Sequence, residues 1–439
     1  MSDWIVFGSR PRKSGVEITA VIQNPSSYLQ KKSDQSITDS IVIPALKIDV
    51  FPITQATRAV IDYTASDRRL AKSHWKFYDG GISAAISLYK DQPSANLILI
   101  ENNDDPQSLF SALEGLAQEC LPETKVILIS QNNDVNLYRE LIASGVTDEL
   151  TTPLQSMTLV EAIAKAWEDE AAPRIGRLIA FIGARGGVGS STVAHNVAAA
   201  MARRHETQTL LADLDLQFGT VGLDFDVDGS YGMNDILSSA SRLDDVLLDR
   251  IVLKYADNLQ LLASEPTLDR VADVHGGAIE KLLELAQTTE RHVLLDMPRI
   301  WTRRTKQAMI SADQIIITAT PDLTSLRNTK TITEFLRQAR PNDPMPILVM
   351  NQVGQPRRPE IPLAEFAESV RLDEGHVIPF NASLFGRAAN NGQVVTMYSE
   401  RSRLAQIFNE ISEEILTPGV KRRSVSFQRR LVRFLRKYW

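Results

Sequence analysis

Short apolar runs alternate with amphipathic stretches along most of the chain, beginning near Lys47. The apolar runs have the length of buried β-strands, and the stretches between them have helical periodicity. The strand candidates in the first part are Ile48–Ile53, Trp75–Tyr78, Asn96–Glu101, Lys125–Ser130 and Asp148–Leu150. Helical candidates lie at Pro106–Glu119, Asn136–Ser144 and Met157–Trp167. Five such strand–helix units predict a parallel sheet with flavodoxin-like strand order.

The same alternation resumes after a charged, proline-containing segment and continues to about Thr417. Its strand candidates are Gly176–Gly183, Leu210–Asp215, His292–Pro298, Gln314–Ala319, Ile347–Asn351 and His376–Phe380. Its helical candidates are Ser190–Arg203, Ser325–Arg340, Leu363–Arg371 and Arg403–Leu416. The pattern therefore predicts an α/β protein with two doubly wound parallel-sheet domains.

Amino-acid composition indicates further segments outside the two predicted domains. The first 46 residues are polar and rich in Ser, Gln and Lys, so we expect them to be mostly disordered. The predicted organisation is a disordered segment at 1–46, a first domain at 47–168, a linker at 169–174, a second domain at 175–417 and a basic tail at 418–439.

A glycine-rich segment joins the predicted strand Gly176–Gly183 to the predicted helix Ser190–Arg203. It reads Gly-Ala-Arg-Gly-Gly-Val-Gly-Ser-Ser-Thr over 183–192. Phosphate loops read G-x-x-x-x-G-K-[ST]: their glycines let backbone N–H groups approach a polyphosphate, the lysine reaches the terminal phosphates, and the hydroxyl binds Mg²⁺. A tight turn without a ligand is the alternative. The strand–loop–helix context favours the phosphate loop.

This loop departs from the standard pattern. Ser190 stands at the lysine position, Ala184 replaces the first glycine, and Arg185 carries the only nearby cation. The sequence therefore predicts that the chain binds a nucleotide with Mg²⁺ and handles it unusually. The residues expected to bind the nucleotide are Gly186, Gly187, Val188, Gly189, Ser190, Ser191 and Thr192.

Acidic residues follow two further apolar runs of the second domain. Asp213 and Asp215 end one run, and Asp296 ends another. Carboxylates at the carboxyl ends of parallel strands face the ligand crevice of a doubly wound sheet. These residues are therefore candidates for nucleotide chemistry, and the alternative is that they are buried carboxylates that cap helices.

Cysteine usage, charge and hydropathy exclude several classes of protein. Cys120 is the only cysteine, so a cysteine-ligated cluster within one chain, and a reductase that depends on one, are excluded. Residues 421–439 hold eight basic residues and no acid, so a net charge of −6 for the whole chain leaves −14 for residues 1–420. An acidic body argues against a broad nucleic-acid surface. No segment reaches the roughly 20 apolar residues of a membrane span, so we expect a cytoplasmic protein.

The basic tail has two faces when it is drawn as a helix. Apolar side chains fall within one arc, and the cations lie opposite. The apolar residues are Phe427, Leu431, Phe434, Leu435 and Tyr438. This pattern is typical of an interfacial helix that binds an anionic membrane reversibly, here at the inner face of the cytoplasmic membrane or a cell pole. Docking of the tail on its own body or on a partner, and binding to DNA, are the alternatives.

The first domain resembles a response-regulator receiver domain, with departures at its strand ends. The first strand ends in Val50-Phe51-Pro52, without an acidic pair, and Glu101 stands where the phosphoacceptor aspartate is expected. Ser130 fits the pattern, but Thr152 stands where a lysine is expected. The resemblance implies a degenerate receiver used for protein contacts. A working phospho-switch and an unrelated small α/β domain are the alternatives.

The second domain resembles the MinD/ParA-type ATPases, whose deviant Walker A loop carries an additional basic residue at the position of Arg185. Several runs are similar to the CpaE/TadZ branch of that superfamily. These runs are Arg185–Thr192, Asp213–Thr220, Leu223–Phe225, Arg242–Leu248 and Ala388–Gly392. That branch joins a degenerate receiver domain to such an ATPase and serves the assembly of tight-adherence (Flp-type) pili.

The resemblance implies a homodimer that forms on ATP binding. Arg185 would act in trans on the partner's phosphates, and Asp215 would lie near the attacking water. Ser191, Asp213 and Asp296 would surround Mg²⁺.

It also implies that the base is bound at the ends of later strands. Asn351 would read the adenine, and Pro379-Phe380 and Asn391-Gly392 would flank it.

The expected function is therefore that of an ATP-binding, weakly hydrolysing localisation or scaffold factor with pilus assembly proteins as partners. A ParA-like DNA or cargo partitioning ATPase is the alternative, although the acidic body makes nucleic acid an unfavourable partner.

Overall fold

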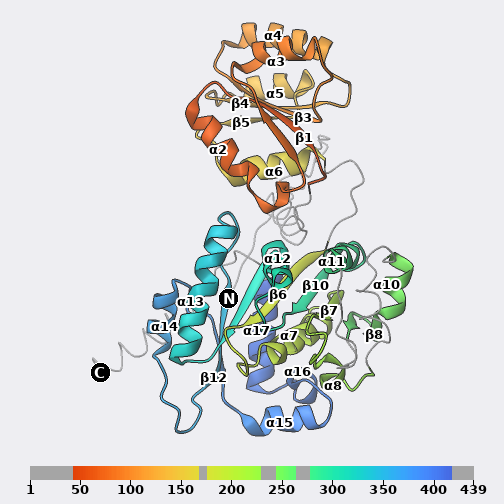
Figure 1. Cartoon of the computed structure of the whole chain (residues 1–439), viewed down its shortest axis with the longest axis vertical. Coiled ribbons are helices and arrows are strands. Elements are labelled where there is room, and N and C mark those ends of the chain that lie inside the picture. Colours follow the sequence, from red (N-terminus) through yellow and green to blue (C-terminus); the bar gives the residue numbers. More distant parts are fainter. Residues whose placement is uncertain (1–42, 168–175, 229–243, 264–276, 418–439) are drawn as a thin grey trace, which may run out of the picture. The chain divides into compact units, whose positions relative to one another are not determined.

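The computed structural model describes residues 43–167, 176–228, 244–263 and 277–417. Within these ranges the chain forms a five-stranded sheet and an eight-stranded sheet, each covered by helices (Figure 1). The predicted α/β class with two doubly wound parallel-sheet domains is confirmed. The predicted linker at 169–174 and the basic tail at 418–439 lie outside the described residues.

The five-stranded sheet has the order β2-β1-β3-β4-β5, and every pair in it is parallel. Its strands are β1 (Lys47–Phe51), β2 (His74–Phe77), β3 (Leu97–Asn102), β4 (Lys125–Ser130) and β5 (Asp148–Thr151). Its helices are α2 (Gln55–Ala65), α3 (Gly81–Tyr89), α4 (Pro106–Glu119), α5 (Val135–Ala143) and α6 (Ser156–Ala166), with a 3₁₀ turn at Arg68–Leu70. This is the flavodoxin-like order expected from the sequence.

Two apolar layers cover the two faces of this sheet. Ile61 of α2 and Ile163 of α6 pack on one face. Helices α3, α4 and α5 cover the other face through residues such as Leu116. Ile43 and Leu46 are also buried in the first layer, so packed chain begins before the predicted boundary at Lys47.

The eight-stranded sheet has the order β13-β12-β11-β6-β10-β7-β9-β8. Its strands are β6 (Arg177–Gly183), β7 (Thr209–Asp213), β8 (Leu253–Ala256), β9 (Leu259–Leu262), β10 (His292–Asp296), β11 (Gln314–Ala319), β12 (Ile347–Val353) and β13 (His376–Pro379). All its pairs are parallel except β8 with β9, which form an antiparallel edge that the sequence patterns did not indicate.

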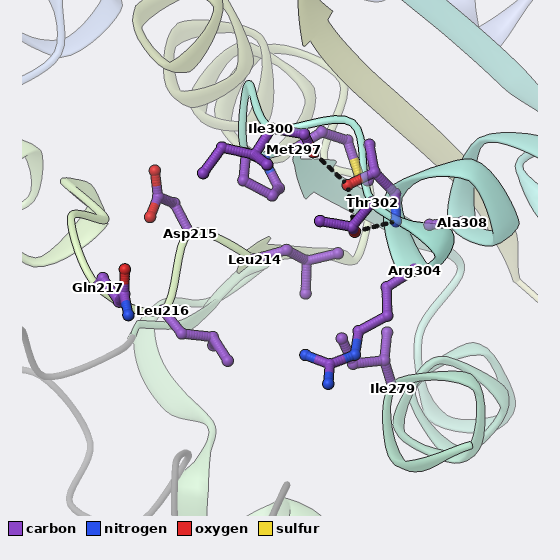
Figure 2. A pocket seen from close by; sticks show the side chains of 12 residues that line it. Leu214, Asp215, Leu216, Gln217, Ile279, Met297, Ile300, Thr302, Arg304 and Ala308 are labelled. Carbon is purple, nitrogen blue, oxygen red and sulfur yellow. Dashed lines mark hydrogen bonds between the residues drawn. The ribbon is translucent and has the colours of Figure 1, made fainter. Parts of the chain in front are cut away.

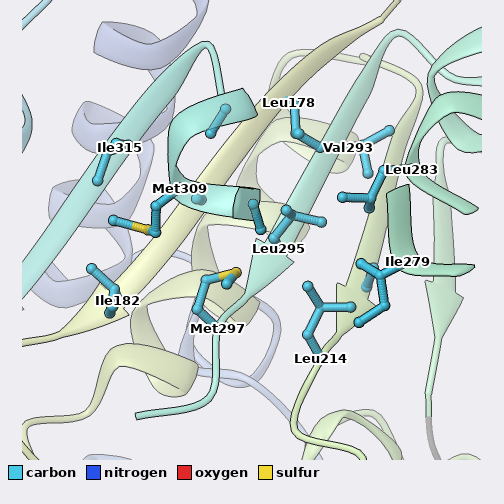
Figure 3. Packing of buried hydrophobic residues seen from close by; sticks show 14 of the residues in the cluster. Leu178, Ile182, Leu214, Ile279, Leu283, Val293, Leu295, Met297, Met309 and Ile315 are labelled. Carbon is cyan, nitrogen blue, oxygen red and sulfur yellow. The ribbon is translucent and has the colours of Figure 1, made fainter. Parts of the chain in front are cut away.

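Helices lie on both faces of this sheet. They are α7 (Ser190–Arg204), α8 (Val221–Asp224), α10 (Asp245–Ile251), α11 (Ala278–Thr289), α12 (Arg303–Ser311), α13 (Leu323–Ala339), α14 (Leu363–Val370), α15 (Ala382–Asn390), α16 (Val395–Tyr398) and α17 (Arg403–Leu416). Figure 3 shows the face beneath α11 and α12, where Ile279 and Met309 pack on Leu295 of the central strand β10. On the other face, α7 packs between the sheet and α17, and its alanines allow this close approach. The helix that carries the phosphate loop is therefore buried along most of its length.

No helix within the described residues is both long enough and apolar enough to span a membrane.

Candidate nucleotide-binding site

The phosphate loop lies at the carboxyl edge of the eight-stranded sheet, in the middle of that edge. Strand β6 runs between β10 and β11, and β10 pairs with β7 so that Asp296 is opposite Asp213. The ends of these parallel strands therefore meet beside the loop that follows Gly183. The sequence prediction that the carboxylates face this loop agrees with the strand register.

Two glycines give the loop its shape. Gly187 and Gly189 have φ values of 77° and 85°, in the left-handed region that favours glycine. Gly189 is also the last residue before α7, whose exposed N–H groups point towards the loop.

The carboxyl end of β12 holds the loop in place. The Asn351 side chain donates a hydrogen bond from Nδ2 to the Val188 carbonyl at 2.7 Å, and Gln352 Nε2 donates to the Gly187 carbonyl at 2.9 Å. Asn351 Oδ1 accepts from the backbone N–H of Gln352 at 2.8 Å. Asn351 therefore lies beside the loop, with its amide group bound to protein atoms.

The residue at the lysine position supplies no charge. The Ser190 hydroxyl oxygen is buried, and it has no hydrogen-bond partner among the described residues. An orphaned buried hydroxyl at the start of a helix, beside a glycine cradle, fits a bound phosphate. Ser191 and Thr192 follow it in the first turn of α7.

The Arg185 side chain is bound to its own chain. Its guanidinium donates to the Asp322 carboxylate at 2.9 Å, to the Thr320 hydroxyl at 3.1 Å and to the Gly186 carbonyl at 3.0 Å. Burial raises the pKa of Asp322, but the bonds from Arg185 and Thr320 outweigh burial and lower that pKa to about 2. Asp322 also caps α13 by accepting from Ser325 N at 2.9 Å.

A buried histidine lies among the carboxylates at the strand ends. His195 is fully buried, and its Nδ1 and Nε2 atoms lie 2.7 Å from Asp224 and 3.3 Å from Asp296. Burial lowers the pKa of His195, but the two carboxylates outweigh burial and raise that pKa to about 10. The imidazolium therefore offsets negative charge beside Asp296, one of whose oxygens has no hydrogen-bond partner among the described residues.

Asp213 is buried next to Asp296. Burial and the charge of Asp296 raise the pKa of Asp213 to about 7. Its oxygens accept from the backbone N–H groups of Asp215 and Val221. A Cβ on Gly219 would lie 2.2 Å from the Asp213 carboxylate, so the chain passes this carboxylate closely. Paired carboxylates of this kind suit a divalent cation, which would lower their mutual repulsion.

Asp215 lines a pocket of about 260 Å³ between the ends of β7 and β10 and helix α12. Figure 2 shows Asp215 at one side of this pocket and Arg304 at the other, with Leu214 between them and Met297 next to Ile300. Asp215 also accepts from Phe218 N at 3.1 Å. It is half-buried, whereas Asp213 and Asp296 are buried.

Pro379 and Phe380 lie at the end of β13, the edge strand that pairs with β12. The Phe380 N–H donates to the Val353 carbonyl at 2.8 Å, and its side chain is 37% exposed. The two residues are therefore on the same edge of the sheet as Asn351, and the structure gives neither of them a hydrogen bond to the phosphate loop.

Sequence reasoning missed several residues that contact the loop or its carboxylates, and one, Asp224, that contacts His195 beside them. They are His195, Asp224, Arg299, Asp322 and Gln352. Only Asp322 carried a local signal, because Asp-x-x-Ser before a helical run is typical of an N-cap. The others are recognised only from their positions in space.

Glu101 of the first domain lies where a receiver domain would carry its phosphoacceptor, and it is almost fully buried. Its carboxylate accepts hydrogen bonds from the backbone N–H groups of Ile53 and Thr54 and from the hydroxyls of Thr54 and Thr57, at 2.6 to 2.8 Å. Burial raises the pKa of Glu101, but these bonds outweigh burial and lower it below its ordinary value. The carboxylate thus binds the start of α2.

Comparisons with known proteins agree with the geometry. A family model described as an AAA domain matches residues 176–345. The septum site-determining protein MinD of Bacillus subtilis is 22% identical over 252 residues, which are 56% of this chain and 91% of that protein. The solved ParA family ATPase of Chlorobium tepidum is 22% identical, with a TM-score of 0.50, over 54% of this chain and 98% of that one. This last likeness shows the fold.

A further solved structure gives a more specific relationship. The pilus assembly protein CpaE of Caulobacter crescentus is 39% identical, over 28% of this chain and 94% of that one, with a TM-score of 0.28. The sequence identity over nearly all of that structure, and not the superposition, carries the relationship. The chain therefore belongs to the MinD/ParA superfamily and has a CpaE-type architecture.

Proposed function

We propose that this protein binds ATP with Mg²⁺, hydrolyses it slowly, and uses the nucleotide to control its dimerisation as a localisation or scaffold factor in tight-adherence (Flp-type) pilus assembly. One observation carries the proposal: the glycine-rich loop lies beside the paired carboxylates Asp213 and Asp296 but has an uncharged serine in place of the lysine. Such a site keeps the groups that bind a nucleotide and loses one that stabilises charge on the transferring phosphoryl.

The proposed roles follow from these positions. The N–H groups of residues 186–192 would bind the phosphates. Ser191, Asp213 and Asp296 would hold Mg²⁺, which supplies charge neutralisation between the phosphates when bound. Asp215, on the half-buried turn after β7, would orient the water.

The adenine site is the least defined part of the proposal. Asn351 would read the base after releasing the Val188 carbonyl, and Pro379 and Phe380 would flank it. The shared strand edge supports this placement.

Exposed apolar side chains around the loop support dimerisation through this face. Phe218 and Leu223 follow β7, Ile300 and Trp301 follow β10, and Leu323 follows β11; they are 45 to 73% exposed. Apolar groups gathered on one edge of a sheet are typical of an interface. Arg185, which lies on the same edge, would act on the partner's phosphates.

The proposed place of action is the inner face of the cytoplasmic membrane or a cell pole, with pilus assembly proteins as partners. The CpaE relationship supports the pilus role, and the basic face of 421–439 supports reversible attachment to anionic lipid.

The test is a titration of the full chain with ATP and Mg²⁺, followed by a measurement of its mass in solution. We expect nucleotide binding and a doubling of mass that requires both ligands. An identical mass with and without nucleotide would contradict the dimer switch. Salt-sensitive retention on nonspecific duplex DNA would instead favour a ParA-like partitioning ATPase.

A further inference from the structure

The Arg299 side chain lies directly against the phosphate loop. A Cβ built on Gly186 would be 2.9 Å from Arg299 Nη1, 3.5 Å from its Cδ and 3.8 Å from its Cζ. The guanidinium therefore lies close to the backbone of the loop at position 186. Arg299 reaches the loop from a different element, three residues after Asp296 at the end of β10.

The contact with Arg299 is made at position 186, within the glycine-rich loop. Gly187 and Gly189 have positive φ values, which favour glycine for conformational reasons. Gly186 does not have a positive φ. The atoms that a Cβ at position 186 would meet all belong to the Arg299 side chain.

Arg299 is a cation at the loop that has no carboxylate partner among the described residues, in contrast to Arg185 and His195. Arg185 is bound to Asp322, and His195 lies between Asp224 and Asp296. Arg299 is exposed and forms no ion pair or side-chain hydrogen bond within the described ranges. Its charge is therefore available to an anion at the loop.

The site also needs a cation. Ser190 gives no charge where phosphate loops carry lysine, and Asp213, Asp215 and Asp296 gather at the same edge. A polyphosphate approaching these carboxylates meets repulsion, which a positive charge on the loop would offset. A guanidinium is permanently charged and binds phosphate oxygens in a bidentate manner.

We propose that Arg299 replaces the missing loop lysine and binds the polyphosphate of the nucleotide held by its own chain. The position is intramolecular because the guanidinium lies on Gly186 of the same chain. The positive charge that binds the phosphates thus comes from the segment after β10, whereas phosphate loops usually carry it as a lysine in the first turn of the following helix. This inference rests on the proposed nucleotide binding. It adds the residue that would give the loop its affinity for nucleotide in the absence of the lysine.

The test measures the affinity of the full chain for a fluorescent, nonhydrolysable ATP analogue. Arg299→Ala should weaken binding by about 10- to 100-fold, the range expected for a lost charge-assisted contact. Arg299→Lys should retain most of the affinity. The matched control is Arg303→Ala, an exposed arginine in the same segment that does not lie on Gly186, and it should bind as the parent does.

A second variant tests the replacement directly. In the Arg299→Ala background, Ser190→Lys restores a cation at the usual position and should recover most of the lost affinity. Equal melting temperatures of the ligand-free variants will show that folding is unchanged. Titrations are made at protein concentrations where the chain is a monomer and where it is a dimer. A loss of affinity in both shows that Arg299 contacts the nucleotide bound by its own chain, and not the one bound by the partner.

Three outcomes would overturn the inference while the proposed function stands. One is an Arg299→Ala variant that binds as tightly as the parent. Another is an equal loss in Arg303→Ala, which would indicate only a general positive field. The third is a loss confined to the dimer, which would place Arg299 on the partner's nucleotide. A parent chain that binds no nucleotide would overturn the proposed function as well.

Discussion

Arg185 and Asp322 form an ion pair within one chain, although 137 residues separate them in the sequence. The guanidinium also binds Thr320, so three elements of its own domain hold it: the loop, the end of β11 and the start of α13. A role for Arg185 on a partner's phosphates requires that it leave Asp322. In the proposed mechanism the pair would therefore oppose the dimer in the absence of nucleotide.

Arg185→Ala should leave a monomer at protein concentrations where the parent with ATP and Mg²⁺ is a dimer. The reason is that the proposed trans contact with the partner's phosphates is lost. Mass in solution with and without nucleotide provides the measurement. A dimer of the variant with the parent's concentration dependence would show that Arg185 is not needed.

Asp322→Asn should shift the monomer–dimer equilibrium the other way. Asparagine keeps the N-cap of α13 but lacks the charge that holds Arg185, so the arginine is released more readily. We expect the nucleotide-bound dimer to form at lower protein concentration, by about 2- to 10-fold. Asp322→Asn combined with Arg185→Ala is the control, since it should behave as Arg185→Ala alone.

Hydrolysis should be slow because Ser190 cannot stabilise charge on the transferring phosphoryl group. We expect turnover well below the ~1 s⁻¹ or more shown by most enzymes. Phosphate release under saturating ATP and Mg²⁺ is the measurement. Ser190→Lys should tighten nucleotide binding, and a parent turnover near that of an ordinary phosphate-loop ATPase would contradict the prediction.

Glu101→Gln should destabilise the receiver-like domain by about 2–4 kcal/mol, because an amide cannot accept all four hydrogen bonds. The pKa of Glu101 is lowered on folding, so its stabilising contribution is present above the unfolded pKa of about 4.3 and is lost as pH falls through the folded value. Urea unfolding of parent and variant from pH 7 to pH 3 is the measurement. Exposed Glu123→Gln is the control and should leave the unfolding free energy unchanged.

The same bonds bear on phosphorylation of this domain. Because both Glu101 oxygens are held by the start of α2, we expect a small-molecule phosphodonor to leave the mass of the chain unchanged. Stoichiometric acyl phosphate on the domain would instead indicate a working phospho-switch.

Deletion of residues 421–439 should reduce sedimentation with anionic vesicles. The tail combines an apolar arc with a cationic arc, so binding of the parent should also fall as salt is raised. Leu431→Glu should weaken binding even at low salt because it places a charge on the apolar face. If the deletion variant binds the vesicles as well as the parent does, the tail instead docks on a protein partner or on the protein's own domains.

The sequence alone determined the class of the fold and the place of the phosphate loop. Strand-length apolar runs and helical periodicity depend on local composition, so the order of strands and helices could be predicted to within a few residues. Several elements escaped this reasoning, among them helices α11, α12 and α15 and the hairpin of β8 and β9. The hairpin of β8 and β9 is short and partly exposed, and its pattern does not distinguish it from a loop.

The carboxylates of the site were also predictable, for a topological reason. Strands that follow one another in a parallel α/β domain end on the same edge of the sheet, so Asp213 and Asp296 had to approach the loop after β6.

Only the tertiary structure decided which charges meet at that loop. Arg299 on Gly186, Arg185 with Asp322, and His195 between two carboxylates all join residues from different elements. Periodicity reports which face of an element is apolar, but it does not report which polar side chains from separate elements meet. Those contacts depend on register, packing and the path of the loops, which are fixed only when the sheet and its helices assemble.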